Sequence, residues 1–105
     1  MKNMRKIKVI AICGSLKFKE EMIKIAIQLE LAGNVALIPI FPTNNEMNYT
    51  EEEKTMLGKM HKEKIKIADA IFVVNINGYI GESTKREIEY AKAQNKEILY
   101  LEEKK

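Results

Sequence analysis

Short apolar runs alternate along this chain with longer segments of helical periodicity. Each run is rich in β-branched residues and bounded by glycine, proline or polar residues, which predicts a strand. The predicted strands are Ile7–Cys13, Val35–Phe41, Ala70–Val74 and Ile98–Leu101. The predicted helices are Lys17–Ala32, a segment from Thr50 to about Ala68, and Glu82–Gln94. The order βαβαβαβ implies parallel strands in one sheet, with helices on both of its faces.

This alternation predicts a small doubly wound α/β fold, flavodoxin-like or Rossmann-like. Its four parallel strands are expected in the order 2-1-3-4, with three helices. In such sheets ligands bind beyond the carboxyl ends of the strands, at the switch point between the first and third strands. The loops Gly14–Lys19 and Asn75–Glu87 follow those two strands. We therefore expect any ligand site to lie between these loops.

The second predicted helix begins with a clear signal, because Thr50 followed by Glu53 matches a capping box. The helix is expected to bury one apolar stripe. That stripe is predicted to contain Met56, Leu57, Met60, Ile65 and Ala68. His61, the only histidine, borders this stripe. The favoured interpretation is a packed, hydrogen-bonded side chain rather than a ligand, and the alternative is that its end of the helix approaches the ligand site.

Composition limits the class of protein. A length of 105 residues predicts a single domain spanning 1–105, and 46% hydrophobic with 31% charged residues is typical of a globular chain. The single Cys13 cannot form an internal disulfide, which favours a reducing compartment. The run Ile7–Cys13 is too short to span a membrane. We therefore expect a cytoplasmic protein with no membrane partner.

The charge pattern bears on possible partners. The net charge is +3, and the lysines are spread along the chain between glutamates. A groove for nucleic acid would show clustered basic residues with interleaved aromatic ones, and this sequence has neither. Nucleic acid is therefore not a predicted partner. The charge leaves a mild preference for small anionic molecules.

The first loop offers candidate binding residues. Gly14 permits a sharp turn, and Ser15 can cap the following helix or present free N–H groups to an anion. Lys17 and Lys19 could add positive charge. The alternative is an ordinary strand-to-helix turn, since the pattern is neither a Walker loop nor a dinucleotide fingerprint.

The second loop contains Asn75, Asn77, Gly81 and Ser83 as candidate contacts, the last at a helix N-terminus where anions bind. It also contains two apolar residues, Tyr79 and Ile80, which are unusual in a loop without a ligand or partner.

Glu87 has two interpretations. Thr84-x-x-Glu87 matches a capping box, which accounts for a glutamate there without catalysis, and the pattern alone favours that interpretation. Asp69 is interpreted as a turn residue at the end of a helix, and Cys13 as a small core residue. No group of His, Cys or carboxylate residues has the spacing of metal ligands.

Three segments together resemble the nucleoside 2-deoxyribosyltransferase superfamily, which includes deoxynucleotide N-hydrolases. The first is Ile12-Cys13-Gly14-Ser15, similar to the strand-then-Gly-Ser opening of the superfamily. The second runs from Ala68-Asp69 through the apolar strand to Asn75. The third runs from Gly81 to Ala91 and continues at Asn95-Lys96-Glu97-Ile98-Leu99. It is similar to the superfamily's stretch in which a Gly and a Ser or Thr precede E-[IL]-x-[YF]-A, followed by K-x-[IV]-[IL]; here three residues separate Ser83 from Glu87.

The resemblance implies an enzyme that attacks the anomeric carbon of a nucleoside or a nucleoside 5′-monophosphate. Glu87 would be the nucleophile, with His61, Asp69 and Asn75 in supporting roles. The loop Gly14–Lys19 would hold the sugar or its 5′ substituent, Lys17 and Lys19 would favour a 5′-phosphate, and Ser83 would add a contact. Hydrolysis is favoured over base exchange. No metal or organic cofactor is needed. A homodimer or higher homo-oligomer is implied, and it would bury the Tyr79–Ile80 region.

Two alternatives remain open. The segment Gly81-x-Ser83-Thr84-x-x-Glu87 also resembles part of the lysine-decarboxylase-like phosphoribohydrolases, which cleave the same kind of bond. A non-catalytic nucleotide- or phosphosugar-binding module on the same fold would keep Gly14, Ser15 and Ser83 but would not need a free carboxylate at position 87.

Overall fold

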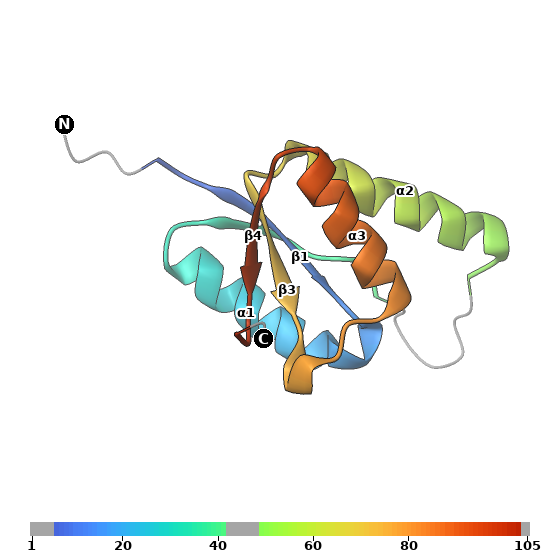
Figure 1. Ribbon diagram of the computed structural model, residues 1–105, viewed down its shortest axis with the longest axis horizontal. Helices are drawn as coiled ribbons and strands as arrows, with labels where there is room; N and C mark the ends of the chain where they lie inside the picture. The colour runs from blue at the N-terminus through green and yellow to red at the C-terminus, as the bar shows by residue number, and fades with distance from the viewer. Residues whose placement is uncertain (1–5, 42–48, 104–105) are drawn as a thin grey trace.

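Four strands and three α-helices alternate along the chain in the computed structural model, which describes residues 6–41 and 49–103 (Figure 1). The strands are β1 Val9–Gly14, β2 Val35–Leu37, β3 Ala70–Val74 and β4 Glu97–Tyr100. The helices are α1 Lys19–Leu31, α2 Glu51–Ile67 and α3 Glu82–Ala93. Two short 3₁₀ turns, η1 Leu16–Phe18 and η2 Ile76–Gly78, follow β1 and β3. Between the second predicted strand and the second predicted helix the sequence indicates a polar loop over 42–49, and nearly all of it lies outside the described residues.

The four strands form one sheet in the order β2-β1-β3-β4, and every pair is parallel. This confirms the predicted order and the flavodoxin-like class. The two central strands are in register from Ile10 opposite Ala70 to Gly14 opposite Val74. Cys13 and Gly14 therefore end β1 beside the end of β3, at the carboxyl edge where the switch point was expected.

The helices form two layers around the sheet (Figure 1). Because side chains of a strand alternate between its faces, successive β1 residues contribute to different clusters. Ile12 packs with Met22 and Ile25 on the α1 side. Cys13 packs on the α2 and α3 side, in the cluster that contains Ile65 and Ile88. At the end of β1, the Cys13 thiol therefore faces α2 and α3, whereas the apolar Ile12 side chain packs against α1.

The predicted start of α2 is confirmed. The Thr50 hydroxyl accepts a hydrogen bond from the Glu53 N–H at 3.0 Å, and the Glu53 carboxylate accepts one from the Thr50 N–H at 2.8 Å. This reciprocal pair satisfies N–H groups that have no partner inside the helix. The helix therefore begins at a fixed residue, which sets where its later side chains lie.

The predicted buried stripe of α2 is partly wrong. Met56 and Met60 are 54% and 43% exposed, whereas His61 is buried with Ile65 and Ala68. The physical reason for Met56 is the position of the helix, whose first half extends beyond the sheet (Figure 1), so that no strand lies beneath this residue. The face that does reach the sheet carries His61, one helical step away from Met60.

Several other boundaries differ from the predicted ones, including those of β1 and β4 by one or two residues. The second strand ends at Leu37, well before Phe41, since Pro39 cannot donate to a ladder. The first helix is preceded by η1, and α1 begins at Lys19 rather than Lys17. Within the described residues, none of the helices has both the length and the apolar character needed to cross a membrane.

Candidate active site

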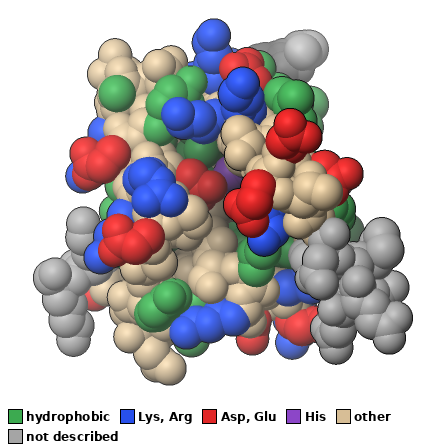
Figure 2. Space-filling model, turned by 90° about the vertical axis from the view of Figure 1, so that its right-hand side faces the viewer, with side chains coloured by type: hydrophobic (Ala, Val, Ile, Leu, Met, Phe, Trp, Pro, Cys, Tyr) green, Lys and Arg blue, Asp and Glu red, His purple; other side chains and the backbone are tan. Residues whose placement is uncertain are grey.

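A cleft of about 360 Å³ opens at the carboxyl edge of the sheet. Figure 2 shows a hollow in which a histidine is recessed, and the chain has only one histidine. The lining comes from the end of β1, from η1, from the segment after β2, and from α2 and α3. The lining residues are Gly14, Leu16, Pro39, Ile40, Tyr49, Lys54, Leu57, Gly58, His61, Ser83 and Glu87. A volume of this size lies within the range of small-molecule sites.

Gly14 is at the point where β1 meets the cleft, and close packing requires a glycine there. A Cβ atom at this position would lie 3.2 Å from Cβ of Val74 and 3.3 Å from Sδ of the buried Met22. Such distances are shorter than ordinary van der Waals contact. The absence of a side chain therefore lets β1, β3 and α1 close together behind the cleft.

We expect Gly14→Ala to destabilise the fold by about 1 to 3 kcal/mol, because the added methyl group overpacks a site with no room. Gly58→Ala is the matched control. Its Cβ meets nothing within 4 Å, and alanine in a helix is favoured over glycine by roughly 0.5 to 1 kcal/mol. Denaturant unfolding of both variants measures the difference. Equal stabilities would contradict the packing argument.

Three chemically active side chains converge at the base of the cleft, one from each of three elements. Cys13 belongs to β1, His61 to α2 and Glu87 to α3. The Cys13 Sγ atom lies 3.7 Å from Nε2 of His61, and one side-chain donor atom from each residue lies within 4.8 Å of the others. Cys13 and His61 are buried, and Glu87 is partly buried. We call these residues the Cys13–His61–Glu87 cluster.

The environment of Glu87 favours the protonated form of its carboxyl group. Burial raises the pKa of its carboxyl from 4.5 to about 7, and the Cys13 side chain and the Arg86 charge oppose that rise only in part. Glu87 therefore exchanges its proton much closer to neutral pH than an ordinary glutamate does. A carboxylate with this pKa, in a cleft, is the kind of group that active sites use as a nucleophile, acid or base.

His61 and Cys13 are both uncharged at neutral pH. Burial, with a smaller effect of the nearby Lys64 charge, lowers the pKa of His61 from 6.5 to about 4. Burial, followed by the Glu87 charge, raises the pKa of the Cys13 thiol well above its usual range. Glu87 therefore has no cationic partner inside the cluster that would bind its carboxylate as an ion pair.

Glu87 does not act as a helix cap. The N-cap of α3 is Gly81, which makes no side-chain capping bond, and Glu87 lies in the second turn of the helix. The buried Thr84 hydroxyl has no hydrogen-bond partner among the described residues. The predicted capping box between Thr84 and Glu87 is therefore wrong. The helix starts three residues earlier than the box requires, which leaves the Glu87 carboxylate facing the cleft.

The structure brings together four of the residues predicted for the site, namely Gly14, His61, Ser83 and Glu87. It corrects the position of Asp69. This residue precedes β3 at the amino edge of the sheet, where its carboxylate accepts a hydrogen bond from the Val9 N–H at 2.8 Å. Its own N–H donates to the Val9 carbonyl at 2.7 Å. Asp69 thus holds the starts of β1 and β3 together, at the edge opposite the cleft.

The two predicted asparagines do not line the cleft. The buried side chain of Asn75 exchanges hydrogen bonds with the backbone of Glu102 at 2.8 and 3.0 Å. The N–H of the exposed Asn77 donates to the Glu102 carboxylate at 3.1 Å. Both residues therefore tie the loop after β3 to the chain end after β4. Gly81 serves as the N-cap of α3 and packs beside the ring of Tyr79.

The remaining first-loop residues also face elsewhere. The Ser15 hydroxyl caps the short turn η1 by accepting from the Lys17 N–H at 3.3 Å. The Lys17 ammonium lies 3.6 Å from the centre of the Tyr79 ring, and that of Lys19 lies 5.7 Å from the centre of the Phe41 ring. Cation–π attraction to these rings accounts for both orientations.

Sequence reasoning missed two polar members of this region. Cys13 was interpreted as core, which its burial confirms, yet its thiol also contacts the buried histidine. Lys54 lines the cleft and pairs with Glu51 at 3.4 Å. The only available signal for Lys54 was its place one turn after the capping box. No pattern along the chain could pair Cys13 with residues so distant in sequence.

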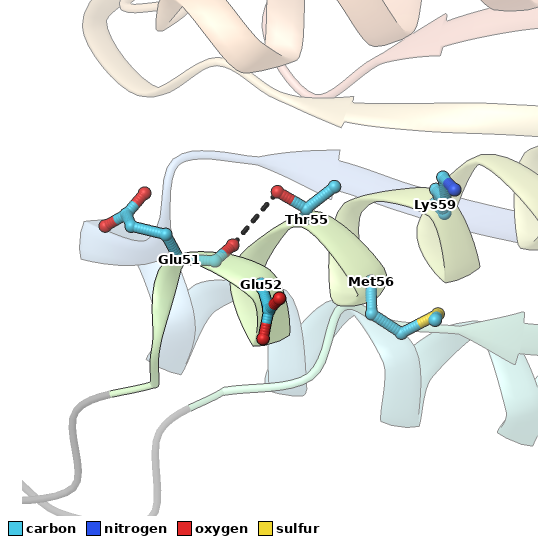
Figure 3. Close-up of a pocket in the computed structure, with 5 residues that line it drawn as sticks. All are labelled: Glu51, Glu52, Thr55, Met56 and Lys59. Carbon is cyan, nitrogen blue, oxygen red and sulfur yellow. Dashed lines mark hydrogen bonds between the residues drawn. The ribbon is translucent and has the colours of Figure 1, made fainter.

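A second hollow, of about 330 Å³, is formed by one helix. Figure 3 shows the side chains that line it, Glu51, Glu52, Thr55, Met56 and Lys59, all carried by the first half of α2. The Thr55 hydroxyl donates to the Glu51 carbonyl at 2.9 Å, a bond that belongs to the helix itself. Its side chains are exposed, so this hollow lacks the desolvated groups that distinguish the cleft.

The fold and the cleft define the chain as a doubly wound parallel α/β domain with a pocket at the switch point of the sheet. No protein-family model and no curated protein matches it. Solved structures do. A 2-deoxyribosyltransferase from Bacillus psychrosaccharolyticus matches with a TM-score of 0.65 and 20% identity over 88% of this chain and 70% of that one.

Two further structures match equally well. A 2-deoxyribosyltransferase from Leishmania mexicana has a TM-score of 0.65 and 22% identity, over 89% of this chain and 63% of that one. A conserved protein from Enterococcus faecalis V583 has a TM-score of 0.64 and 16% identity, over 90% of this chain and 63% of that one. The chain therefore has the fold of the 2-deoxyribosyltransferases, as the sequence resemblance predicted, and spans about two thirds of their length.

Proposed function

We propose that this chain cleaves the N-glycosidic bond of a nucleoside or nucleoside 5′-monophosphate, with Glu87 as the nucleophile and with hydrolysis as the favoured outcome. The observation that carries the proposal is the carboxylate itself. Glu87 is desolvated, faces a cleft at the switch point, caps no helix and has no cationic partner in its cluster. The shared fold supports the same reaction class.

The reaction proceeds in two steps. A carboxylate oxygen of Glu87 forms a bond to the anomeric carbon, and the carbon–nitrogen bond breaks with its electron pair passing to the departing base. Water then attacks the same carbon of the glycosyl ester, which releases the sugar and restores the carboxylate. With the pKa of Glu87 at about 7, the ionised form is available at neutral pH and remains more basic than an ordinary glutamate.

Each wall of the cleft has a role in this proposal. The apolar side chains of Leu16, Ile40 and Leu57 would contact the base, since ligand pockets are lined mainly by such groups. Lys54 and Ser83 would contact the sugar or a 5′-phosphate. Neutral His61 would position Glu87 without forming an ion pair that ties up its carboxylate. Lys17 and Lys19 stay outside this group because their ammonium groups lie on aromatic rings.

The test is direct. The protein is incubated with a panel of nucleosides and their 5′-monophosphates, and free base is measured by chromatography. Time-dependent release of base from at least one member supports the proposal. Calorimetric binding of a nucleotide without any release of base would instead identify a non-catalytic binding module. Such a module would use the cleft but would not need a free carboxylate at position 87.

We also propose that the chain forms a homodimer through the surface around Tyr79. This side chain is 46% exposed and packs edge-on against Phe18 at 6.0 Å between ring centres, whereas Ile80 packs against the core. Tyr79→Glu is expected to lower the sedimentation coefficient from the value of a dimer to that of a monomer. The reason is that the introduced charge would have to be desolvated in the interface. Leu31→Lys, at the opposite edge of the sheet, is the control. A dimer unaffected by Tyr79→Glu would refute this surface.

A further inference from the structure

We propose that the Cys13–His61–Glu87 cluster binds a divalent transition-metal cation of the Zn²⁺ class. We further infer that the bound cation withholds Glu87 from glycosidic chemistry, an inference that rests on the proposed function. One element contributes each ligand, so that β1, α2 and α3 would be joined at the carboxyl edge of the sheet. The fourth coordination position would face the cleft that His61 and Glu87 line.

The distances in the cluster suit such a cation. A tetrahedral zinc with bonds of about 2.3 Å to sulfur and 2.0 Å to nitrogen holds those two atoms about 3.5 Å apart. The Cys13 Sγ atom and the His61 Nε2 atom are already 3.7 Å apart. The Glu87 oxygen lies within 4.8 Å of both. The third bond requires the Glu87 oxygen to lie closer than this limit to the other two ligand atoms, and the partly buried Glu87 is the most exposed of the three residues.

The donor types select the metal. Thiolate and imidazole favour zinc and its neighbours, whereas magnesium and calcium favour oxygen ligands alone. Three protein ligands with one open position is the arrangement of exchangeable, solvent-accessible zinc sites rather than closed structural ones. A coordinating thiol loses its proton to the solvent as the metal binds, so the raised affinity of the thiol for its proton does not prevent ligation.

His61 is buried beside another ligand of the proposed site. Its ring is only 6% exposed, and its Nε2 atom lies 3.7 Å from the Cys13 sulfur. A cation bound at Nε2 would lie between that nitrogen and the sulfur. Metal and substrate would then compete for Glu87, because its carboxylate cannot both coordinate zinc and attack a sugar carbon.

Cobalt chloride is the probe for this site, since Co²⁺ occupies zinc sites and reports thiolate ligation by a charge-transfer band in the near ultraviolet. We expect one equivalent of Co²⁺ to produce the band in chelator-treated protein, and ZnCl₂ to displace it. Cys13→Ser should abolish the band. Glu87→Gln and His61→Gln should each weaken binding by more than about 100-fold, while Glu51→Gln, in the exposed hollow of α2, should leave binding unchanged.

Several results would overturn the proposal. They are the absence of a band in wild-type protein, a band that survives Cys13→Ser, and binding that depends on Glu51 instead of Glu87. Cys13→Ala replaces Cys13→Ser if the hydroxyl prevents folding, because it introduces no polar atom. The band is measured without substrate, so the metal site stands or falls independently of base release. If base release occurs and saturating Zn²⁺ leaves its rate unchanged, the inhibitory role is refuted.

Discussion

Glu87→Gln is expected to reduce the release of free base by at least about 1,000-fold, because an amide oxygen cannot replace a carboxylate as the nucleophile. Glutamine has nearly the same shape and removes a group that is costly to ionise in the cleft, so the variant should remain folded. The measurement is the rate of base release under single-turnover conditions, with far-ultraviolet circular dichroism as the check on folding.

Glu89→Gln is the matched control. Glu89 lies two residues further along α3, and its exposed side chain is within 3.8 Å of the Lys92 ammonium. The same chemical change there should leave the rate unchanged, since exposed ion pairs contribute little. Base release by Glu87→Gln at a rate within tenfold of the wild-type rate would remove Glu87 from the mechanism, whatever the activity of the control.

The second large effect concerns the pH dependence of stability. Glu87 and His61 are expected to change the free energy of unfolding in opposite directions, so that their effects cancel in the wild-type protein. The folded pKa of Glu87 is raised from 4.5 to about 7, so folding favours its protonated form. Stability from this group is greatest below pH 4.5 and is lost as the pH rises toward 7. The folded pKa of His61 is lowered from 6.5 to about 4, so its contribution is present above pH 6.5 and is lost as the pH falls toward 4.

Between about pH 4.5 and 6.5 these two effects oppose each other, and the wild-type free energy of unfolding should change little. A variant that removes one of the two groups should reveal the pH dependence due to the other. The free energy of unfolding of His61→Gln is expected to fall by about 2 to 3 kcal/mol as the pH rises from 4.5 to 7. That of Glu87→Gln is expected to fall by a similar amount as the pH falls from 6.5 to 4. Denaturant unfolding at four pH values measures both. Parallel profiles for the two variants would show that these groups do not titrate as described.

Local patterns located all four strands, and their alternation with helices predicted the sheet order, although some strand boundaries differ. The run Ala70–Val74 was predicted with its observed bounds, because a strand buried on both faces has an uninterrupted apolar sequence. The same type of reasoning misplaced the buried face of α2. Hydrophobicity favoured Met56 and Met60, but which face of a helix is buried depends on what lies beneath it, and the face of α2 that packs on the sheet carries His61 and Ile65.

The candidate site was only partly predictable. Position along the chain placed Gly14, Ser83 and Glu87 near the switch point, because topology alone decides which loops meet there. The contact of Cys13 with His61 depends on the rotation of α2 against the sheet, which no local signal encodes. The lysines of the first loop were misplaced for a related reason. A pattern shows the charge of Lys17 but not the Tyr79 ring that its ammonium faces.

The two bonds between Asp69 and Val9 have a consequence for geometry at the far end of the sheet. They fix the alignment of β1 with β3 between the first residue of β1 and the residue before β3, and the pairing then continues without interruption to Gly14 opposite Val74. A slip by one residue would turn every side chain of β1 to the opposite face. The Asp69 carboxylate thus helps to set the register of β1 against β3. Hydrogen bonds at the amino ends of the strands thereby determine which face of the sheet Cys13 occupies at the carboxyl ends.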